Sequence, residues 1–374
     1  MSDVRPYAIS MWDFSWLERR WPGAGYEDWD VALGDLVERG YDAVRIDAYP
    51  HLVSADPHRQ WDLRPAWNQT SWGAQSRVTV CVLPNLLAFI QAARRHGVRV
   101  ALSTWYREDD DDTRMRIRTP QDQAQIWLDT LRAIDTAGLL DSVLYVDLCN
   151  EFPVQAWAPF MYRMASDPPL SRTQPEVTGW MRESIERLRA DFPELDYTFS
   201  FCTEFATWPE QDVSFLDVLE PHVWMSHPET SGFNARVGYD FQKFDPVGFD
   251  NLVSRGRSEY EANREHYDAA LYRTIDTVAE WSRATGKGLW TTECWAVVDW
   301  KDWPGLDWDW VMDLTARGCE RAAASGRWLG MSTSNFCGPQ FHGMWREVDW
   351  HLRLTDIIRS APVDPEIATS RAVR

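Results

Sequence analysis

The chain has 374 residues, of which 44% are hydrophobic and 13% aromatic, and its formal net charge is −19. This composition can bury a large core and excludes a disordered or fibrous chain. An acidic surface repels phosphate backbones and anionic lipid headgroups, so nucleic-acid and membrane partners are not expected. The first residues show no secretion-signal pattern, and six scattered cysteines form no CxxC pair. We therefore expect a cytoplasmic protein with reduced, structural thiols.

The dominant pattern along the chain is a short apolar run followed by an amphipathic stretch, repeated from end to end. The apolar runs predict strands at Tyr7–Met11, Ala43–Ala48, Val98–Thr104, Ser142–Cys149, Tyr197–Cys202, Val218–Trp224, Gly288–Glu293 and Trp328–Ser334. The stretches between them predict helices at Glu27–Arg39, Leu83–His96, Thr119–Thr136, Gln174–Phe192, Glu259–Thr285, Trp308–Ser325 and Trp345–Ile358. Between the fifth and sixth strands, Glu210–Phe215 predicts a single turn. Such alternation is typical of βαβ units with a parallel sheet.

Eight strands alternating with about eight helices predict an α/β fold, a closed (β/α)8 TIM barrel. An open doubly wound sheet is the alternative, but no G-x-G-x-x-G or Walker sequence follows the first strand. No repeat or linker divides the chain. We expect one domain over residues 1–374, with the barrel core at about residues 5–360 and a loosely packed tail after Ala361.

Two long insertions, Pro50–Val80 and His227–Ser258, follow the second and sixth predicted strands. Both emerge at the C-terminal face, where barrel enzymes build their active sites. The chain also has 23 tryptophans, several of which lie in loop-like stretches. A flat indole face suits the CH-rich face of a sugar ring, although core filling is the alternative for any single residue. These loop tryptophans are Trp61, Trp67, Trp72, Trp105, Trp208, Trp300, Trp303 and Trp308.

Two apolar strands end in a glutamate. Leu144–Pro153 reads LYVDLCNEFP and carries Asn150-Glu151, and Gly288–Trp295 reads GLWTTECW and carries Glu293. The fourth and seventh strands lie on opposite sides of a barrel mouth, so the two carboxylates can face each other. Such a pair can cleave a glycosidic bond, with one group donating a proton and the other attacking the anomeric carbon.

Other polar residues lie within or just after predicted strands. Arg45 lies inside an apolar run, so we expect a carboxylate partner, either Glu293 or a structural acid such as Asp47. Asp47 and His51 end the second strand and could grip sugar hydroxyls, whereas His222 could be a substrate contact or a core histidine. The acidic run from Glu108 to Asp112 invites a calcium site, but a solvated loop is favoured because no EF-hand spacing is present.

These residues together resemble the clan A glycoside hydrolases, the "4/7" barrel superfamily. Asn150-Glu151 and Glu293 end the fourth and seventh strands; Ala43-Val-Arg45-Ile-Asp47 looks like the strand-two element of family five, and His222-Val-Trp224 resembles its His-x-aromatic. The resemblance covers residues 5–360. It implies a retaining glycosidase with Glu151 as acid/base and Glu293 as nucleophile, steadied by Arg45, with no metal and no cofactor. We expect the charge of Arg45 to keep Glu293 ionised and the negative charge of Glu293 to raise the pKa of Glu151, which must be protonated.

The sequence departs from that family at three strand ends. The third strand ends at Trp105 rather than a histidine, and Trp224 replaces the usual tyrosine on the sixth. The eighth ends at Asn335-Phe336, so Phe336 or nearby Trp345 must replace the usual tryptophan. Trp105, Asn335, Phe336 and Trp295, which follows Glu293 closely, are candidate sugar contacts. Asn150 and Trp224 are candidates for binding the substrate or supporting the site. These features look most like a cellulase-like branch that includes β-mannosidases.

A cytoplasmic enzyme meets only short oligosaccharides, and the two insertions could wall off one end of the cleft, so we expect an exo-acting enzyme for short β-linked oligosaccharides. The resemblance to that branch implies a β-mannosidase. A β-glucosidase and an endo-acting glucanase or mannanase of the same clan are the alternatives. Two other classes are a catalytically dead sugar-binding barrel and a metal-dependent sugar isomerase that uses Asp47, Glu204 and His222 as ligands. The sequence leaves the oligomeric state open, a homo-oligomer included.

Overall fold

The computed structural model describes residues 4–66, 73–227, 230–240, 243 and 245–368. Seven parallel strands lie side by side in the order β7–β6–β5–β2–β1–β11–β9. In chain order these strands are β1 (Tyr7–Ser10), β2 (Ala43–Asp47), β5 (Arg99–Ser103), β6 (Val143–Asp147), β7 (Asp196–Thr198), β9 (Leu289–Thr291) and β11 (Trp328–Met331). The parallel sheet that the sequence predicts is therefore present.

The sixth predicted strand closes this sheet into a barrel. Parallel bridges join Phe201 to Pro221 on one side and Leu219 to Leu289 on the other. Above them, β8 (Val223–Trp224) pairs in parallel with β10 (Cys294–Trp295), which continues the seventh strand. Every strand of the barrel that the structure describes thus has a neighbour on both sides, and the predicted (β/α)8 architecture is confirmed.

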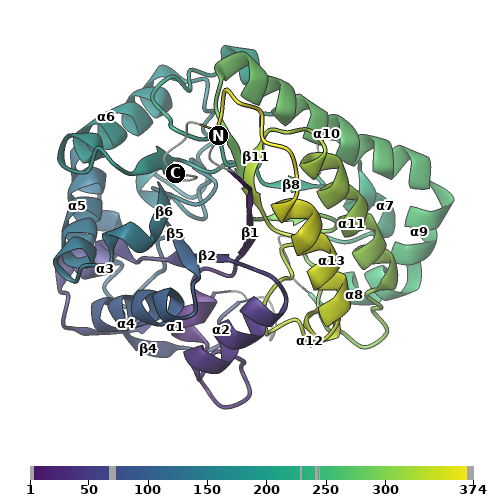
Figure 1. Ribbon diagram of the computed structural model, residues 1–374, viewed down its shortest axis with the longest axis horizontal. Coiled ribbons are helices and arrows are strands. Elements are labelled where there is room, and N and C mark those ends of the chain that lie inside the picture. Colours follow the sequence, from purple (N-terminus) through teal and green to yellow (C-terminus); the bar gives the residue numbers. More distant parts are fainter. Residues whose placement is uncertain (1–3, 67–72, 228–229, 241–242, 244, 369–374) are drawn as a thin grey trace.

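Helices surround the strands in the ribbon view (Figure 1). The helices that match predictions are α2 (Trp29–Glu38), α4 (Val82–Arg95), α5 (Pro120–Thr136), α6 (Pro175–Asp191), α10 (Arg264–Thr285), α11 (Asp309–Ala323) and α13 (Val348–Arg359). The start of α5 follows local chemistry: Thr119 and Asp122 form a reciprocal capping box with Pro120 in the first turn. The expected single turn between the fifth and sixth strands is a 3-10 turn at Trp208–Glu210.

Two predicted helices are divided in the structure. The stretch predicted as Glu259–Thr285 breaks at Asn263, whose backbone leaves the helical region, so α9 (Arg257–Ala262) precedes α10. The stretch predicted as Trp345–Ile358 begins after α12 (His342–Trp345) and a non-helical Glu347. The apolar period continues across each break and therefore conceals it.

Both predicted insertions contain regular structure. The first holds α3 (Pro50–Ala55) and an antiparallel hairpin of β3 (Gln60–Leu63) and β4 (Val78–Cys81); Trp67 and Trp72 lie outside the described residues. The second holds α7 (Phe233–Val237), α8 (Pro246–Asn251) and a π-helical turn at Leu252–Gly256. Near β1, α1 (Ser15–Glu18) adds a single turn. No described helix has the length and apolarity needed to cross a membrane.

The acidic run from Glu108 to Asp112 is largely paired with arginines. Glu108 contacts Arg64 and Arg114, and Asp110 contacts Arg77. Asp109 is buried and accepts the backbone N–H groups of Asp111 and Thr113. The run therefore fastens the hairpin to the barrel instead of forming the purely solvated loop that the sequence favours.

The lower barrel is filled by a cluster that includes Ile9, Tyr145, Trp290 and Leu329. Gly330 has to be glycine, because a Cβ there would lie 2.2 Å from the indole of Trp290. Ile367 belongs to the same cluster and is buried, and the Asp364 N–H donates to the Gly326 carbonyl. The expectation of a loose tail after Ala361 is therefore wrong up to residue 368, because the tail packs under the barrel.

Candidate active site

Glu151 lies just beyond β6, at the C-terminal mouth of the barrel. Its backbone is left-handed (φ 48°), a costly conformation for a non-glycine residue, and its N–H donates to Ser200 Oγ at 2.8 Å. Ser200 in turn donates to buried Asp147 at 2.8 Å. The indole N–H of Trp157 donates to Glu151 Oε2 at 3.0 Å, and the Cys202 thiol also hydrogen-bonds to the carboxylate. The position of Glu151 is thus determined by both its backbone and its side chain.

Glu293 faces Glu151 from the seventh strand, beyond β9. Its carbonyl accepts the Val223 N–H at 3.0 Å, which fixes the backbone between the sixth and seventh strands. One oxygen of each glutamate and one ring nitrogen of His222 all lie within 4.8 Å of one another. The side chains keep only 12% (Glu151) and 5% (Glu293) of their accessible surface. The two predicted carboxylates therefore meet in a nearly closed site.

Arg45 lies at the centre of the site, and its side chain is completely buried. It reaches Glu293 Oε1 at 3.1 Å, as the sequence predicts. It also binds Asp13 through two nitrogens, at 2.8 and 2.9 Å, and Glu220 Oε1 at 2.9 Å. Thr292 Oγ1 accepts from Arg45 at 2.7 Å and donates to Glu220 at 2.8 Å. One cation therefore serves three carboxylates, and only part of its charge is available to Glu293.

His222 lies between the two catalytic candidates. Its Nδ1 is 2.9 Å from Glu151 Oε1 and 3.5 Å from Glu293 Oε1, while Nε2 is 3.0 Å from an Arg45 nitrogen. Because Arg45 can only donate, this last contact requires an unprotonated Nε2, and neutral His222 then carries its proton on Nδ1. Burial alone lowers the pKa of His222, but Glu293 and the hydrogen bond to Glu151 outweigh it and raise the pKa.

The pKa directions of the glutamates are the reverse of the expected ones. Burial, reinforced by the charge of Glu151, raises the pKa of Glu293 to about 7. Burial also acts on Glu151, but the hydrogen bond and the charge of His222, together with the hydrogen bonds from Trp157 and Cys202, outweigh it and lower that pKa. Two carboxylates this close titrate as a pair, so the shared proton rests on the Glu293 side in this arrangement. The expectation that Arg45 keeps Glu293 ionised fails because Asp13 and Glu220 also draw on the guanidinium.

Two buried donors at the site have no acceptor among the described residues. Asn150 accepts from Arg45 at 2.7 Å through Oδ1, which fixes the amide orientation and leaves Nδ2 without a partner. The indole nitrogen of Trp224, which lies edge-on to His222, is likewise unsatisfied. An unmet buried donor is costly unless a ligand or water satisfies it. Asn150 and Trp224 therefore fit the predicted role of substrate contacts.

Asp47 and His51 are buried and bound within the protein. Asp47 accepts the backbone N–H groups of Tyr49 and Trp105 at 2.7 and 2.9 Å, and burial raises its pKa to about 7. His51 contacts the Arg107 carbonyl at 3.0 Å, and burial lowers its pKa to about 4. The prediction that they grip sugar hydroxyls is wrong for this structure, because they hold the loops after β2 and β5.

Trp105 supports the site from behind. Its indole N–H donates to Asp13, the residue that binds Arg45, and its ring packs against Trp157 with centroids 4.6 Å apart. Trp157 in turn contacts Glu151. Trp105 is almost fully buried, so its place is that of a supporting residue and not of an open sugar platform.

The candidates near the seventh and eighth strands are also buried. Trp295 packs under α11, where a Cβ on Gly318 would lie 2.6 Å from it, and Phe336 packs between Trp308 and Phe341. Asn335 donates to the Val298 carbonyl at 3.2 Å and keeps an unsatisfied Oδ1. A sugar platform needs an accessible face, so the proposed sugar contacts of Trp295 and Phe336 are wrong. Trp345, the other residue considered, stacks on Tyr41 and Arg39 instead.

The loop tryptophans behave similarly. Trp61, Trp300 and Trp308 are buried, and Trp208 stacks on Trp281 with centroids 6.2 Å apart. Trp303 keeps an accessible portion. Core filling thus accounts for most of the described loop tryptophans.

The ligand set of a metal-dependent isomerase is not assembled. Glu204 accepts from Ser171 and from the Arg172 N–H, and Asp47 is bound as above, so neither joins His222. Instead Glu151, His222 and Glu293 form a triad whose geometry could hold a cation. Sequence reasoning also missed Asp13, Glu220 and Trp157; of these, Glu220 had a signal, since it interrupts an apolar strand as Arg45 does.

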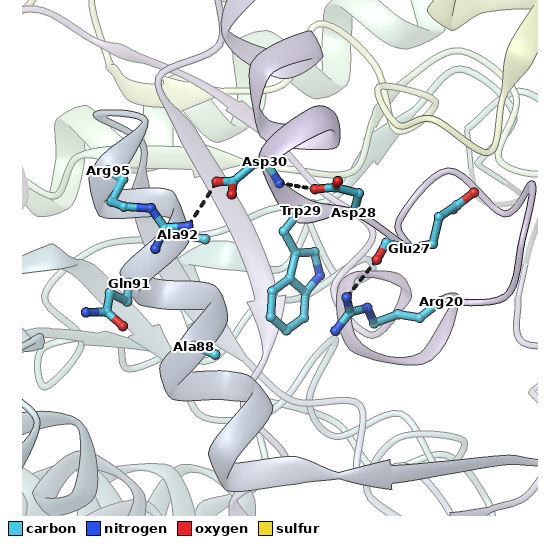
Figure 2. A pocket seen from close by; sticks show the side chains of 9 residues that line it. All are labelled: Arg20, Glu27, Asp28, Trp29, Asp30, Ala88, Gln91, Ala92 and Arg95. Atoms are coloured by element: carbon cyan, nitrogen blue, oxygen red, sulfur yellow. Dashed lines mark hydrogen bonds and ion pairs between the residues drawn. The ribbon is translucent and has the colours of Figure 1, made fainter.

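A surface cavity of about 350 Å³ lies away from this site, between α2 and α4 (Figure 2). Its lining is mostly polar, with Arg20 over the Trp29 ring and Arg95 paired to Asp30. None of the candidate catalytic residues lines it. The cavity is therefore separate from the glutamate pair.

Comparison with known proteins identifies the family. The profile of a family described as "Cellulase-like: Sugar-binding cellulase-like" matches residues 9–359. The chain belongs to this cellulase-like family. A protein of Parabacteroides distasonis ATCC 8503, provisionally described as a glycoside hydrolase, is 45% identical, with a TM-score of 0.95 over 99% of this chain and 98% of that one. The cellulase-like protein is thus a glycoside hydrolase, and the resemblance drawn from its motifs is confirmed.

More distant structures share the fold. A family 5 mannosidase of Rhizomucor miehei is 11% identical, with a TM-score of 0.52 and 96% of each chain covered. An endo-β-1,4-mannanase of Thermotoga petrophila is 10% identical, with a TM-score of 0.53 over 96% of this chain and 77% of that one. Among curated proteins, none matches the cellulase-like chain.

Proposed function

We propose that the cellulase-like protein is a retaining β-glycosidase that cleaves short β-linked oligosaccharides from one end by double displacement. Glu293 attacks the anomeric carbon, and Glu151 protonates the leaving oxygen and then activates water. The observation that carries this proposal is the meeting of the two glutamates at the barrel mouth, with oxygens within 4.8 Å. Inverting enzymes need about 6.5–9.5 Å between carboxyl groups to admit a water molecule, so the short gap supports retention.

Action at a chain end is supported by how closed the site is. Glu293 is almost inaccessible, and structured insertions follow β2 and β8 on the same face as the glutamates. A walled pocket accepts a terminal sugar more readily than the middle of a polymer. As substrates we propose β-mannosides first and β-glucosides second, from the resemblance to the β-mannosidase branch. Paired kinetics on 4-nitrophenyl β-mannoside and β-glucoside, followed by the matching disaccharides, test this order.

The shared proton makes a pH prediction. The form with one proton on the pair is the active one, and kcat/KM should fall as pH rises through about 7, where that proton is lost. The acid limb should lie below the ordinary glutamate range, because the pKa of Glu151 is lowered. A kcat/KM profile that stays flat well above pH 7 would contradict the shared proton.

The acid/base role of Glu151 predicts a dependence on the leaving group. Glu151→Gln should lower kcat/KM by about 10²–10⁴-fold for a disaccharide, whose leaving oxygen needs a proton. An activated aryl glycoside needs little protonation, so its kcat/KM should fall far less. The alkaline limb of the kcat/KM profile of Glu151→Gln on this substrate should disappear. Glu280→Gln, at an exposed glutamate on α10, is the matched control, because it makes the same substitution on the outer surface. Equal losses on both substrates would contradict the assignment.

The triad of Glu151, His222 and Glu293 also offers the chemistry of a cation site, and one measurement separates the two proposals. Hydrolysis by the glutamate pair needs no metal, so activity should persist after prolonged treatment with a chelator. Loss of activity with EDTA, restored by a divalent cation, would favour metal-dependent chemistry at the same three residues.

A further inference from the structure

The loop over residues 296–308, between β10 and α11, lies on the rim of the same mouth. The Val298 N–H donates to Ser226 Oγ at 3.1 Å, and its carbonyl accepts from Asn335 at 3.2 Å. Ser226 follows the sixth strand and Asn335 follows the eighth. The loop is therefore held between the strands that flank Glu293, on the barrel face where the two glutamates meet.

This loop holds a lysine of low exposure, Lys301, whose ammonium group has no acceptor among the described residues. Lys301 is 4% exposed, and its Nζ lies 4.0 Å from the centre of the Phe249 ring and 4.8 Å from that of Trp303. Within the part of the chain that the structure describes, it forms no hydrogen bond or ion pair. Aromatic faces offset only part of the cost of burying an ammonium group, which still has three hydrogens to donate.

Two residues earlier, Asp299 is 3% exposed, and only one of its two carboxylate oxygens has a hydrogen-bond partner among the described residues. Its Oδ2 accepts from the Tyr239 hydroxyl at 2.6 Å, and Oδ1 has no donor among the described residues. Burial raises the pKa of Asp299 to about 7 and lowers that of Lys301 to about 8, and each charge opposes the shift of the other. However, the Lys301 nitrogen and the Asp299 carboxylate oxygens lie more than 4.0 Å apart, which is too far for a direct ion pair.

Asp299 and Lys301 are residues of low exposure that carry opposite charges near each other without a direct ion pair, and this arrangement fits a ligand that offers a donor and an acceptor side by side. A vicinal diol does this, because one hydroxyl can donate to Asp299 while its neighbour accepts from Lys301. An anionic group would gain from Lys301 but be repelled by Asp299. Trp303 keeps an accessible portion beside the pair and can lie against a sugar ring.

We propose that Asp299, Lys301 and Trp303 form a second sugar subsite, which holds the vicinal hydroxyls of a neutral pyranose next to the one that is cleaved. This inference rests on the proposed glycosidase function. It makes Asp299 and Lys301 specificity-determining residues for oligosaccharides over simple glycosides.

The test compares a neutral β-linked disaccharide with the 4-nitrophenyl β-glycoside of the same terminal sugar. Lys301→Met, which keeps the length of the side chain against its aromatic neighbours, should lower kcat/KM for the disaccharide by about 10–100-fold, mainly through KM. The loss on the aryl glycoside should be at least tenfold smaller. Asp299→Asn should act in the same direction, and thermal melting should show both variants folded. Lys243→Met, at an exposed lysine, is the matched control and should change neither substrate.

Each remaining outcome has a distinct meaning. Equal losses on both substrates, or no loss on either, would overturn the subsite while leaving the glycosidase in place. If the loss occurs only with a disaccharide whose second sugar is a uronate, these residues bind a carboxylate, and the proposal of a vicinal diol is wrong. Failure of the unaltered enzyme to hydrolyse either substrate would overturn the proposed function, and this subsite with it.

Discussion

Glu293→Ala should lower kcat for hydrolysis by about 10⁴-fold or more, because it removes the carboxylate that we assign as the nucleophile. The fold should survive, since removing Glu293 relieves a cluster that has more carboxylates than cations. Added azide should occupy the vacated space, attack in its place and restore part of the turnover on an activated aryl glycoside, with an inverted product.

The control for this variant is Glu280→Ala, at an exposed glutamate on α10. It should keep full activity, as expected for a surface substitution far from the mouth. Undiminished hydrolysis in Glu293→Ala, or azide products of retained configuration, would contradict the role of Glu293.

Arg45→Met should lower the free energy of unfolding by about 3–5 kcal/mol at neutral pH. The sequence predicts one carboxylate partner for Arg45, but the structure gives it Asp13 and Glu220 as well as Glu293. Without the guanidinium these carboxylates stay buried without compensation, and their pKa values rise. The destabilisation should therefore be smallest at acid pH, where they are protonated in both states, and grow as pH rises.

Denaturant unfolding at two pH values measures this effect. A second substitution, Asp13→Asn, should recover part of the stability that Arg45→Met loses, because it removes one of the uncompensated charges. Arg346→Met, at an exposed arginine, should change the stability by less than about 1 kcal/mol. A stability of Arg45→Met equal to that of the Arg346→Met control would show that the buried network is not needed for folding.

The barrel and the pair of glutamates could be predicted from the sequence because both depend on local patterns. An apolar run that stops at Asn150-Glu151 or at Glu293 ends a strand, and strand order then brings the two ends together. Arg45 was expected to need a carboxylate because its own strand is apolar. The same reasoning extends to Glu220, which lies in the apolar run before His222.

The remaining site residues depend on side-chain directions that no local pattern encodes. Asp47 ends a strand as Glu151 does, yet its carboxylate is taken by the N–H groups of Tyr49 and Trp105. Phe336 ends the eighth strand but packs inward against Phe341. The pKa order of the glutamates was missed because it depends on how many acids share Arg45, which only the closed barrel defines.

The covalent intermediate tests the central claim most directly. A 2-deoxy-2-fluoro β-glycoside with a good leaving group, made from the sugar that the enzyme prefers, should form the glycosyl-enzyme quickly and release it slowly, because fluorine destabilises both oxocarbenium-like transition states. Intact-mass measurement should show one added fluorosugar, and peptide mapping should place it on Glu293. A label on Glu151 or any other residue, or no label while the enzyme turns over the parent glycoside, would contradict the account.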